Sequence, residues 1–407
     1  MPTLHWLGKD KVINHHQDVP FRLLDHQYGA RPDGTQTAEP TGSGNQIIHG
    51  DNLEALKALL PRYEGRVKCI YIDPPYNTGN EGWVYNDNVN DPKIKKWLSQ
   101  VVGKEGEDLS RHDKWLCMMY PRLKLLHKLL HEEGIIMISL DENEITNLRF
   151  LLDEIFGRHQ FVSLLTIVNN PKGRVMDKYF STSHEYCMVY SKTILPAGAF
   201  SIQKTDYQVD REYRLQDGNG VYRLIELRNT HREFNRDTRN NLWYPIYVSE
   251  DLSIISLEIA SSLIEVYPVW DDSFEGCWTW GLPLAIKDSN LLVAKRVKGR
   301  IKVYRKAYAH KNNGERVFKK LSSVWQNPAY YTDKGQQELH SILGIGKKEF
   351  PFPKPVKFIE QLVELATGKD SIVLDSFAGS GTTAHAVLNL NKSDNGNRKF
   401  ILIEMEE

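Results

Sequence analysis

The strongest constraint on the fold is a short apolar run that ends in a stiff acidic turn. Residues 67–72, VKCIYI, have the composition of a buried strand. They lead directly into Asp73-Pro74-Pro75-Tyr76, where the two prolines have a fixed φ and carry no N–H. In an open α/β sheet, ligands bind outside the carboxyl ends of the strands. The sequence therefore predicts a ligand-binding strand end at this turn.

The chemistry of the turn suits an amine on a planar ring. The carboxylate of Asp73 and the carbonyl of Pro74 can each accept one N–H of an exocyclic amine, which turns the nitrogen lone pair toward an electrophile. Pro75 keeps the turn stiff. The ring of Tyr76 offers a face for a nucleobase, a contact of about 1–3 kcal/mol. The alternative interpretation is an ordinary strand-to-loop turn, in which Asp and Pro are common.

A second strand is predicted at 371–375, and it runs into the glycine-rich segment SFAGSGTT at 376–383. Such a turn lets a ligand approach the backbone and meet a helix N-terminus. It lacks the third glycine of a dinucleotide fingerprint and the lysine of a P-loop. A further strand, 399–404, ends in Glu404, about 20 residues past the glycines, where a carboxylate usually binds ribose hydroxyls. These features predict a cofactor that contains a nucleoside.

Together these segments resemble the amino-directed DNA methyltransferases that use S-adenosyl-L-methionine. The resemblance is to the β-ordered adenine-N6 group, which includes the modification (Mod) subunits of type III restriction-modification systems. It covers most of the chain, and the catalytic motif precedes the cofactor loop. The segments that carry it, in order, are 47–56 (IIHGDNLEAL), 73–79 (DPPYNTG), 184–192 (HEYCMVYSK), 352–355 (FPKP) and 376–383.

The resemblance implies an α/β, Rossmann-like doubly wound methyltransferase fold with a β-rich target-recognition insert. We expect an N-terminal arm at 1–46, the catalytic half at 47–192, the insert at 193–335 and the cofactor-binding half at 336–407. Apolar periodicity also predicts helices at 120–131 and 142–156 and strands at 135–140, 161–168 and 186–190. The segment 77–90, rich in Asn, Gly and Asp, is expected to be a loop that orders on DNA.

The resemblance also implies roles for single residues. The target base would be held by Asp73, Pro74, Pro75 and Tyr76. The cofactor would be bound by Asp51, Lys354, Asp375, Phe377, Gly379, Gly381, Thr383 and Glu404. Each has a structural alternative: Asp51 can cap a helix that begins beside it, Lys354 can be a solvated lysine, and Phe377 can simply pack.

The cations are unevenly distributed. The chain has 52 Lys and Arg against 52 Asp and Glu, and a net charge of zero by itself argues against a polyanionic partner. However, residues 295–320 contain eleven cations and the single acid Glu315. Residues 293–297 and 301–308 within them read as a hairpin, and a second cationic and aromatic stretch is 228–244. The predicted DNA-binding residues are Lys298, Arg300, Lys302, Arg305, Lys306, Arg232 and Arg236. A solvated charged face is the alternative.

By resemblance, the expected activity is methyl transfer from S-adenosyl-L-methionine to the N6 amine of an adenine that is flipped out of duplex DNA, within a restriction-modification system. The alternatives are a cytosine-N4 DNA methyltransferase and a non-catalytic DNA-recognition subunit, with a glutamine-directed protein methyltransferase further behind. The expected partners are double-stranded DNA, a second copy of the chain and a restriction helicase-nuclease subunit.

Other features limit the class of protein. The four cysteines are widely spaced and form no C-x-x-C that would hold zinc, so no metal site is predicted. No stretch approaches twenty apolar residues and the N-terminus lacks a secretory apolar region, so we expect a cytoplasmic protein without a membrane segment. The sequence stops three residues after Glu404, before the helix expected there, so either it is truncated or the native protein continues.

Overall fold

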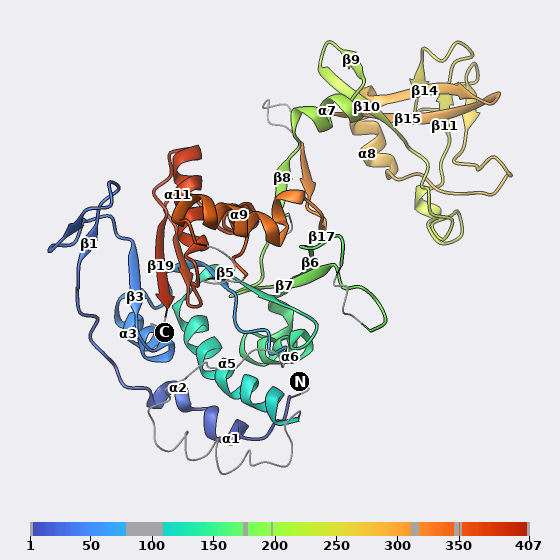
Figure 1. Ribbon diagram of the computed structural model, residues 1–407. Coiled ribbons are helices and arrows are strands. Elements are labelled where there is room, and N and C mark those ends of the chain that lie inside the picture. Colours follow the sequence, from blue (N-terminus) through green and yellow to red (C-terminus); the bar gives the residue numbers. More distant parts are fainter. Residues whose placement is uncertain are drawn as a thin grey trace. The chain divides into compact units, whose positions relative to one another are not determined.

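The structure is a computed structural model that describes residues 3–78, 109–173, 178–196, 198–310, 317–345, 350 and 352–404 (Figure 1). The chain forms two compact units. The first unit combines 1–199 with 322–407, and the second consists of 200–321. The catalytic and cofactor motifs therefore belong to one unit, although the second unit separates them in the sequence.

Within the described residues, eight strands form the main sheet of the first unit in the order β17-β6-β7-β5-β4-β18-β19-β3, and β1 Gly29–Ala30 and β2 Gln36–Thr37 form a separate two-stranded sheet. Strands β3, β19, β18, β4 and β5 run parallel, while β7 is antiparallel to both β5 and β6. The bounds are β3 Gln46–His49, β4 Val67–Ile72, β5 Leu130–Leu140, β6 Phe161–Val168, β7 His184–Ser191, β17 Val324–Trp325, β18 Ile372–Asp375 and β19 Lys399–Glu404.

The strand order reverses between β4 and β18. From β4 the chain crosses to β5 on one side, and from β18 it crosses to β19 on the other. A reversal of this kind opens a crevice at the carboxyl ends of the two strands, and such crevices bind ligands in α/β proteins. The DPPY turn and the glycine-rich segment both leave the sheet at this point.

Helices cover both faces of this sheet. The bounds are α1 Lys9–Val12, α2 His15–Asp18, α3 Asn52–Tyr63, α5 Leu109–Leu129, α6 Ile145–Ile155, α9 Thr332–Leu343, α10 Val356–Ala366 and α11 Thr382–Asp394. Ile70 and Ile72 of β4 join the apolar core that contains α3, α5 and α6. Tyr71, which points the other way, meets the ring of Phe358 on α10, with centroids 6.4 Å apart. Because both faces are covered, β4 is apolar at nearly every position.

The second unit is mainly antiparallel. In its described part, the sheets are β14-β15-β10-β9, β12-β11-β13 and β16-β8. The bounds are β8 Ser201–Gln203, α7 Asp206–Glu212, β9 Leu215–Asp217, β10 Gly220–Glu226, β11 Ile246–Val248, β12 Ile255–Ser256, β13 Ile264–Val266, α8 Leu282–Lys287, β14 Leu292–Val297, β15 Arg300–Tyr308 and β16 Phe318–Lys320. A separate core forms around the buried Trp278, Val303 and Ile246.

The predicted α/β fold class and the predicted hairpin are confirmed. Some element ends differ, since α5 begins at Leu109 and not at 120, and β5 begins at Leu130 and not at 135. Pro121 lies inside α5, and a proline there costs about 3 kcal/mol. Burial of Trp115 and Met119, both fully buried on the same helix, offsets that cost. No described helix is long and apolar enough to span a membrane.

The second unit lies within the predicted insert 193–335, and residues 322–335 contribute β17 and the start of α9 to the first unit. As functional divisions, the domain boundaries stay a prediction. The loop predicted at 77–90 lies outside the described residues from Gly79 onward.

The hairpin turn yields a stability prediction. Lys298 and Gly299 both have positive φ, 50° and 78°, as a two-residue hairpin turn requires. Gly299→Val should lower the free energy of unfolding of the second unit by about 1–2 kcal/mol, because a side chain is strained in this conformation. No atom lies within 4 Å of the added Cβ, so the cost is one of backbone alone. Lys298→Gly is the matched control and should not destabilise. Urea denaturation of both variants measures this, and equal stabilities would contradict it.

Candidate active site

The candidate site is formed where parallel strands end at one edge of the sheet. Asp73 follows β4, Asp375 ends β18 and Glu404 ends β19. Asp51 follows β3 at the start of α3. Because β3, β19, β18 and β4 are parallel neighbours, the predicted base-binding and cofactor-binding residues lie along the same edge.

A partly buried ion cluster surrounds the ammonium group of Lys354. Its Nζ lies 3.4 Å from Asp73 Oδ1 and donates to both carboxylate oxygens of Glu185, at 2.7 and 2.8 Å. It also donates to Tyr76 Oη at 2.5 Å. Tyr76 Oη in turn donates to Glu185 Oε2 at 3.2 Å, and Asn169 Nδ2 donates to the same oxygen at 3.0 Å. The contacts of Lys354 thus place its ammonium on the side of the predicted base pocket.

The electrostatics of the cluster follow from its burial. Desolvation raises the pKa of Asp73 to about 6; the Lys354 ammonium opposes this shift and the Glu185 carboxylate adds to it. Burial alone would lower the pKa of Lys354, but the charges of Asp73 and Glu185 outweigh it and raise that pKa. Burial and the same carboxylates raise the pKa of Tyr76 well above its usual value, so the phenol stays protonated.

Helices α5 and α6 fix the DPPY turn from outside. Trp115 Nε1 donates to the carbonyl oxygen of Pro75 at 2.8 Å. Asn77, which is buried, has a left-handed φ of 59° and donates to the carboxylate of Glu144. That carboxylate is fully buried and lies 2.6 Å from His112 Nδ1. A buried non-glycine residue held in this conformation is typical of functional sites, where surrounding contacts maintain the strain.

The glycine-rich segment is organised by Asp375. Its carboxylate is buried and accepts from Thr383 Oγ1 at 2.5 Å and from the backbone N–H of Phe377 at 3.0 Å. Burial raises the pKa of Asp375 to about 7, against the opposing effect of the Thr383 bond. The contacts of Asp375 and Thr383 are thus directed within the segment, where they fix its path into α11.

Two glycines shape the same segment. Gly379 and Gly381 have positive φ, 51° and 76°, a region that glycine occupies without strain. The backbone N–H of Gly379 donates to Glu404 Oε2 at 2.6 Å, so the segment meets the end of β19. A Cβ on Gly379 would lie 3.1 Å from the ring of Phe350, which leaves no room for a larger residue without movement.

Asp51 caps α3. Its carboxylate accepts from the backbone N–H of Glu54 at 2.9 Å, as the capping interpretation predicted. The Glu54 carboxylate pairs with Arg22. The neighbouring Asn52 donates to the carbonyl oxygen of Ser376 and so ties α3 to the glycine-rich segment.

Several polar oxygens at this edge fit a polar ligand. Among the described residues, Asn52 Oδ1 and Ser376 Oγ are buried without a hydrogen-bond partner, and the donor nearest to the buried Asp73 Oδ1 that meets the ion-pair distance is the Lys354 ammonium at 3.4 Å. Buried oxygens of this kind are costly unless a donor reaches them. The adenine amine, ribose hydroxyls and ammonium of S-adenosyl-L-methionine, and the amine of a target base, are donors of this kind.

The predicted DNA-binding cations of the second unit mostly have partners within that unit. Lys302 pairs with Asp271 at 3.1 Å and Lys306 with Asp217 at 2.6 Å. Arg232 and Arg236 pair with Asp272 and Glu275, Arg300 donates to the carbonyl of Trp270, and Arg305 lies over the ring of Trp280. These acids lie outside the basic run 295–320, so the sequence count overstated its local charge. Lys298 lies in the hairpin turn.

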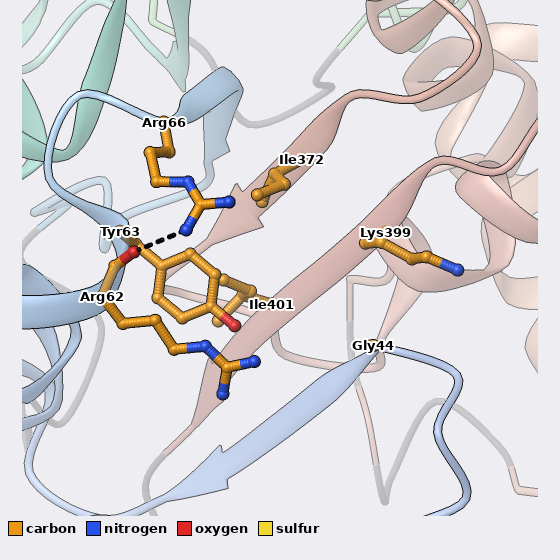
Figure 2. Close-up of a pocket in the computed structure, with 7 residues that line it drawn as sticks. All are labelled: Gly44, Arg62, Tyr63, Arg66, Ile372, Lys399 and Ile401. Atoms are coloured by element: carbon orange, nitrogen blue, oxygen red, sulfur yellow. Dashed lines mark hydrogen bonds between the residues drawn. The ribbon is translucent and has the colours of Figure 1, made fainter.

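A separate cavity lies at the amino ends of the strands, at the other end of the first unit's sheet from the candidate site (Figure 2). Its volume is about 180 Å³, and it is lined by Gly44, Arg62, Tyr63, Arg66, Ile372, Lys399 and Ile401. Ile372 and Lys399 begin β18 and β19, so the cavity is at the amino ends of the strands, away from the candidate site.

Sequence reasoning missed several residues of the site. Glu185, Asn169, Asn77, Glu144 and Trp115 contact the DPPY turn or its ion cluster. Glu185 stood within the motif 184–192, but only the antiparallel pairing of β7 with β5 brings it toward β4.

Comparisons with known proteins support a methyltransferase family. A family model described as DNA methylase matches residues 67–407. The chain is 37% identical to the EcoPI Mod subunit of a type III restriction-modification enzyme from Escherichia phage P1, over 100% of this chain and 64% of that protein. It is 32% identical to the type II methyltransferase M.KpnI of Klebsiella pneumoniae, over 93% of this chain and 84% of that protein.

A search of solved structures found the cytosine-N4-specific PvuII DNA methyltransferase at a TM-score of 0.41 and 13% identity, over 93% of this chain and 86% of that one. The chain spans less than two thirds of the length of EcoPI Mod. The family model covers most of the chain and includes both the DPPY turn and the glycine-rich segment, which confirms the resemblance: the chain belongs to the N6/N4 DNA methylase family.

Proposed function

We propose that this protein transfers a methyl group from S-adenosyl-L-methionine to the N6 amine of an adenine flipped out of duplex DNA. The observation that carries the proposal is the position of Asp73 and Pro74 at the tip of β4, directly beside the glycine-rich segment that follows β18. A base amine and a methyl donor bound at these two neighbouring strand ends would meet at the sheet's point of reversal. The Mod subunit names of the relatives support adenine as the target.

The chain's own residues orient the amine. Asp73 Oδ1, which needs a donor, accepts one N–H and the carbonyl of Pro74 accepts the other. The face of Tyr76 supports the base. When bound, S-adenosyl-L-methionine supplies an electrophilic methyl on its sulfonium sulfur. As the new N–C bond forms and the S–C bond breaks, positive charge grows on the amine, and the carboxylate of Asp73 stabilises it. The amine then loses one proton to solvent or to Asp73.

The cofactor would be held across the glycine-rich segment. Glu404 is proposed for the ribose hydroxyls, Phe377 for contact with the sulfonium, and Gly379 and Gly381 for close approach of the ligand to the backbone. Asp375 and Thr383 support the segment from beneath. Asp51, at the N-terminus of α3, is proposed for the adenine amine of the cofactor. The contacts of Lys354 favour the base pocket over the methionine end of the cofactor.

We also propose that the protein works in a restriction-modification system, on double-stranded DNA in the cytoplasm. The support is that the relatives EcoPI Mod and EcoP15I Mod carry the name of type III restriction-modification enzymes. The word subunit in these names supports a further protein partner, which we propose to be a restriction helicase-nuclease subunit. A second copy of the chain is also a proposed partner.

Asp73→Ala should abolish methyl transfer and leave the affinity for S-adenosyl-L-methionine within a few-fold, because the carboxylate engages the amine and not the methyl donor. The loss in kcat should be on the order of a hundredfold or more. Tritium transfer to duplex DNA measures the rate, and mass analysis of the digested nucleosides identifies the base. N4-methylcytosine in place of N6-methyladenine would overturn the target, and a variant with more than about a tenth of wild-type turnover would overturn the role of Asp73.

Glu404→Ala and Gly379→Val should each weaken S-adenosyl-L-methionine binding. The first loses charged hydrogen bonds to the ribose, and the second places a side chain at a positive φ and against Phe350. Gly42→Val, also at a positive φ but with no atom within 4 Å of the added Cβ, controls for backbone strain. Calorimetric titration of the folded variants measures the affinity. Unchanged affinity in both site variants would place the cofactor elsewhere.

The double variant Lys298→Ala/Arg300→Ala should weaken binding to specific and random duplex alike. For each cation–phosphate pair that the variant removes, the salt dependence should become flatter by about 0.9 log units per decade of salt. Arg62→Ala/Arg66→Ala removes the same charge from the cavity at the amino ends of β18 and β19 (Figure 2). This variant should change the slope little. Fluorescence anisotropy across a salt series gives both slopes. If the two variants behave alike, the hairpin end is only a solvated face.

A further inference from the structure

We propose that Glu185 is a positioning residue for methyl transfer, which holds the ring of Tyr76 and the ammonium of Lys354 in place beside Asp73. The inference rests on the proposed function and deepens it. Glu185 lies on β7, outside both the DPPY turn and the glycine-rich segment, and its side chain is almost fully buried.

The first support is the set of donors that converge on Glu185. Lys354 Nζ reaches both carboxylate oxygens, at 2.7 and 2.8 Å. Tyr76 Oη and Asn169 Nδ2 donate to Oε2, at 3.2 and 3.0 Å. Asn169 follows the end of β6, so donors from three separate parts of the first unit meet at this one carboxylate. A carboxylate with these bonds is fixed in position and fixes its donors in turn.

The second support is what this does to Tyr76. Its hydroxyl lies between Glu185 and the Lys354 ammonium, and that ammonium is 5.0 Å from the centroid of its ring. Because the far end of the ring is held by two charged groups, the ring cannot tilt without breaking these bonds. The face proposed for the target base is therefore set before the base arrives, which lowers the entropic cost of orienting it.

The third support is that Lys354 links the glycine-rich segment to the ion cluster. The carbonyl oxygen of Lys354 accepts from Thr382 Oγ1 at 3.3 Å, and Thr382 is both a residue of the glycine-rich segment and the first residue of α11. One residue therefore contacts the cofactor segment through its backbone and the base pocket through its side chain. The cluster combines two carboxylate side chains with one ammonium, and this excess of acidic groups favours the positive charge that develops on the amine.

A purely structural role does not account for this arrangement. Buried ion pairs contribute little net stability, because desolvation opposes their attraction, and apolar residues of similar shape often serve as well. The cluster instead lies at the strand ends, where the Lys354 ammonium is 3.4 Å from Asp73 Oδ1, the oxygen proposed to accept from the amine.

The chain contains a matched control for the chemistry. Glu154 on α6 accepts from Lys9 Nζ at 2.7 Å and from Tyr120 Oη at 3.2 Å. This Lys–Tyr–Glu trio links α6 to α1 and α5 and is separate from the DPPY turn. Glu154→Gln and Glu185→Gln thus make the same change in two similar trios, of which only one contacts Asp73.

The experiment compares these two variants with the wild type by thermal unfolding, by calorimetric titration with S-adenosyl-L-methionine, and by kcat on duplex DNA at saturating substrates. Glu185→Gln should lower kcat by about a hundredfold, the size expected for misplaced reacting groups, with the cofactor Kd within about threefold of wild type. Glu154→Gln should lower the melting temperature and leave kcat per folded molecule unchanged.

The pH profile supplies a second readout. Asp73 is faced by Tyr71 and Tyr76 from its own segment, by Glu185 and Cys187 from β7, by Lys354 from the segment before α10 and by Asp375 from β18. Its pKa of about 6 in the ligand-free protein predicts an acid limb of kcat/KM near pH 6, because protonation removes the acceptor. Glu185 raises that pKa, so Glu185→Gln should move the limb to lower pH. Glu154→Gln should leave it unchanged.

A Glu185→Gln variant that folds, keeps kcat within about threefold of wild type and shows an unmoved acid limb overturns the inference while the proposed function stands. A wild-type protein that methylates no DNA overturns the proposed function itself. If Glu185→Gln does not fold, Tyr76→Phe decides, since it keeps the ring and removes the hydroxyl. It should lower kcat by at least about tenfold at unchanged cofactor affinity, and wild-type kcat in that variant overturns the inference.

Discussion

The pairing of β4 with β18 is the contact on which the site depends. Two apolar segments, separated by the whole second unit, lie side by side in parallel, with Val373 opposite Cys69 and Leu374 opposite Ile70. The chain leaves each strand in the opposite lateral direction. Both strands are covered on both faces, and this burial explains why their sequences are apolar. Because the chain leaves the two neighbouring strands in opposite directions, their carboxyl ends form the kind of place where α/β proteins bind ligands.

The DPPY turn and the ion cluster beside it combine stiffness with partly buried charge. Prolines, a left-handed Asn77 and the bond from Trp115 hold the turn, while Lys354 pairs with the carboxylates of Asp73 and Glu185. Each buried ion costs several kcal/mol of solvation, an order-of-magnitude figure, and the mutual attraction of the cluster offsets part of it. The carboxylates of such a cluster can stabilise an added positive charge, as the amine would carry in the proposed reaction.

The second unit shows a different balance. Its cations are numerous, yet acids from distant segments neutralise many of them, as Asp217 does for Lys306 and Asp271 does for Lys302. These pairs are only partly exposed, and pairs near the protein surface are weak, so phosphate groups can compete for the cations. The electrostatic character of the surface is therefore set by which acids the fold brings near, and a count along the sequence does not reveal it.

Local sequence was sufficient to predict the strands at 67–72, 161–168 and 399–404, the hairpin around Lys298-Gly299, the α/β class and the family, because these depend on local periodicity, turn chemistry and motif order. The residues that bear on Asp73 from elsewhere are brought there by the tertiary structure alone. Glu185 lies on a strand that is antiparallel to β5, and Lys354 lies 278 positions from Tyr76. No local pattern encodes that they meet, since their contact follows from the order of strands in the sheet, and that order is fixed by burial of the whole core.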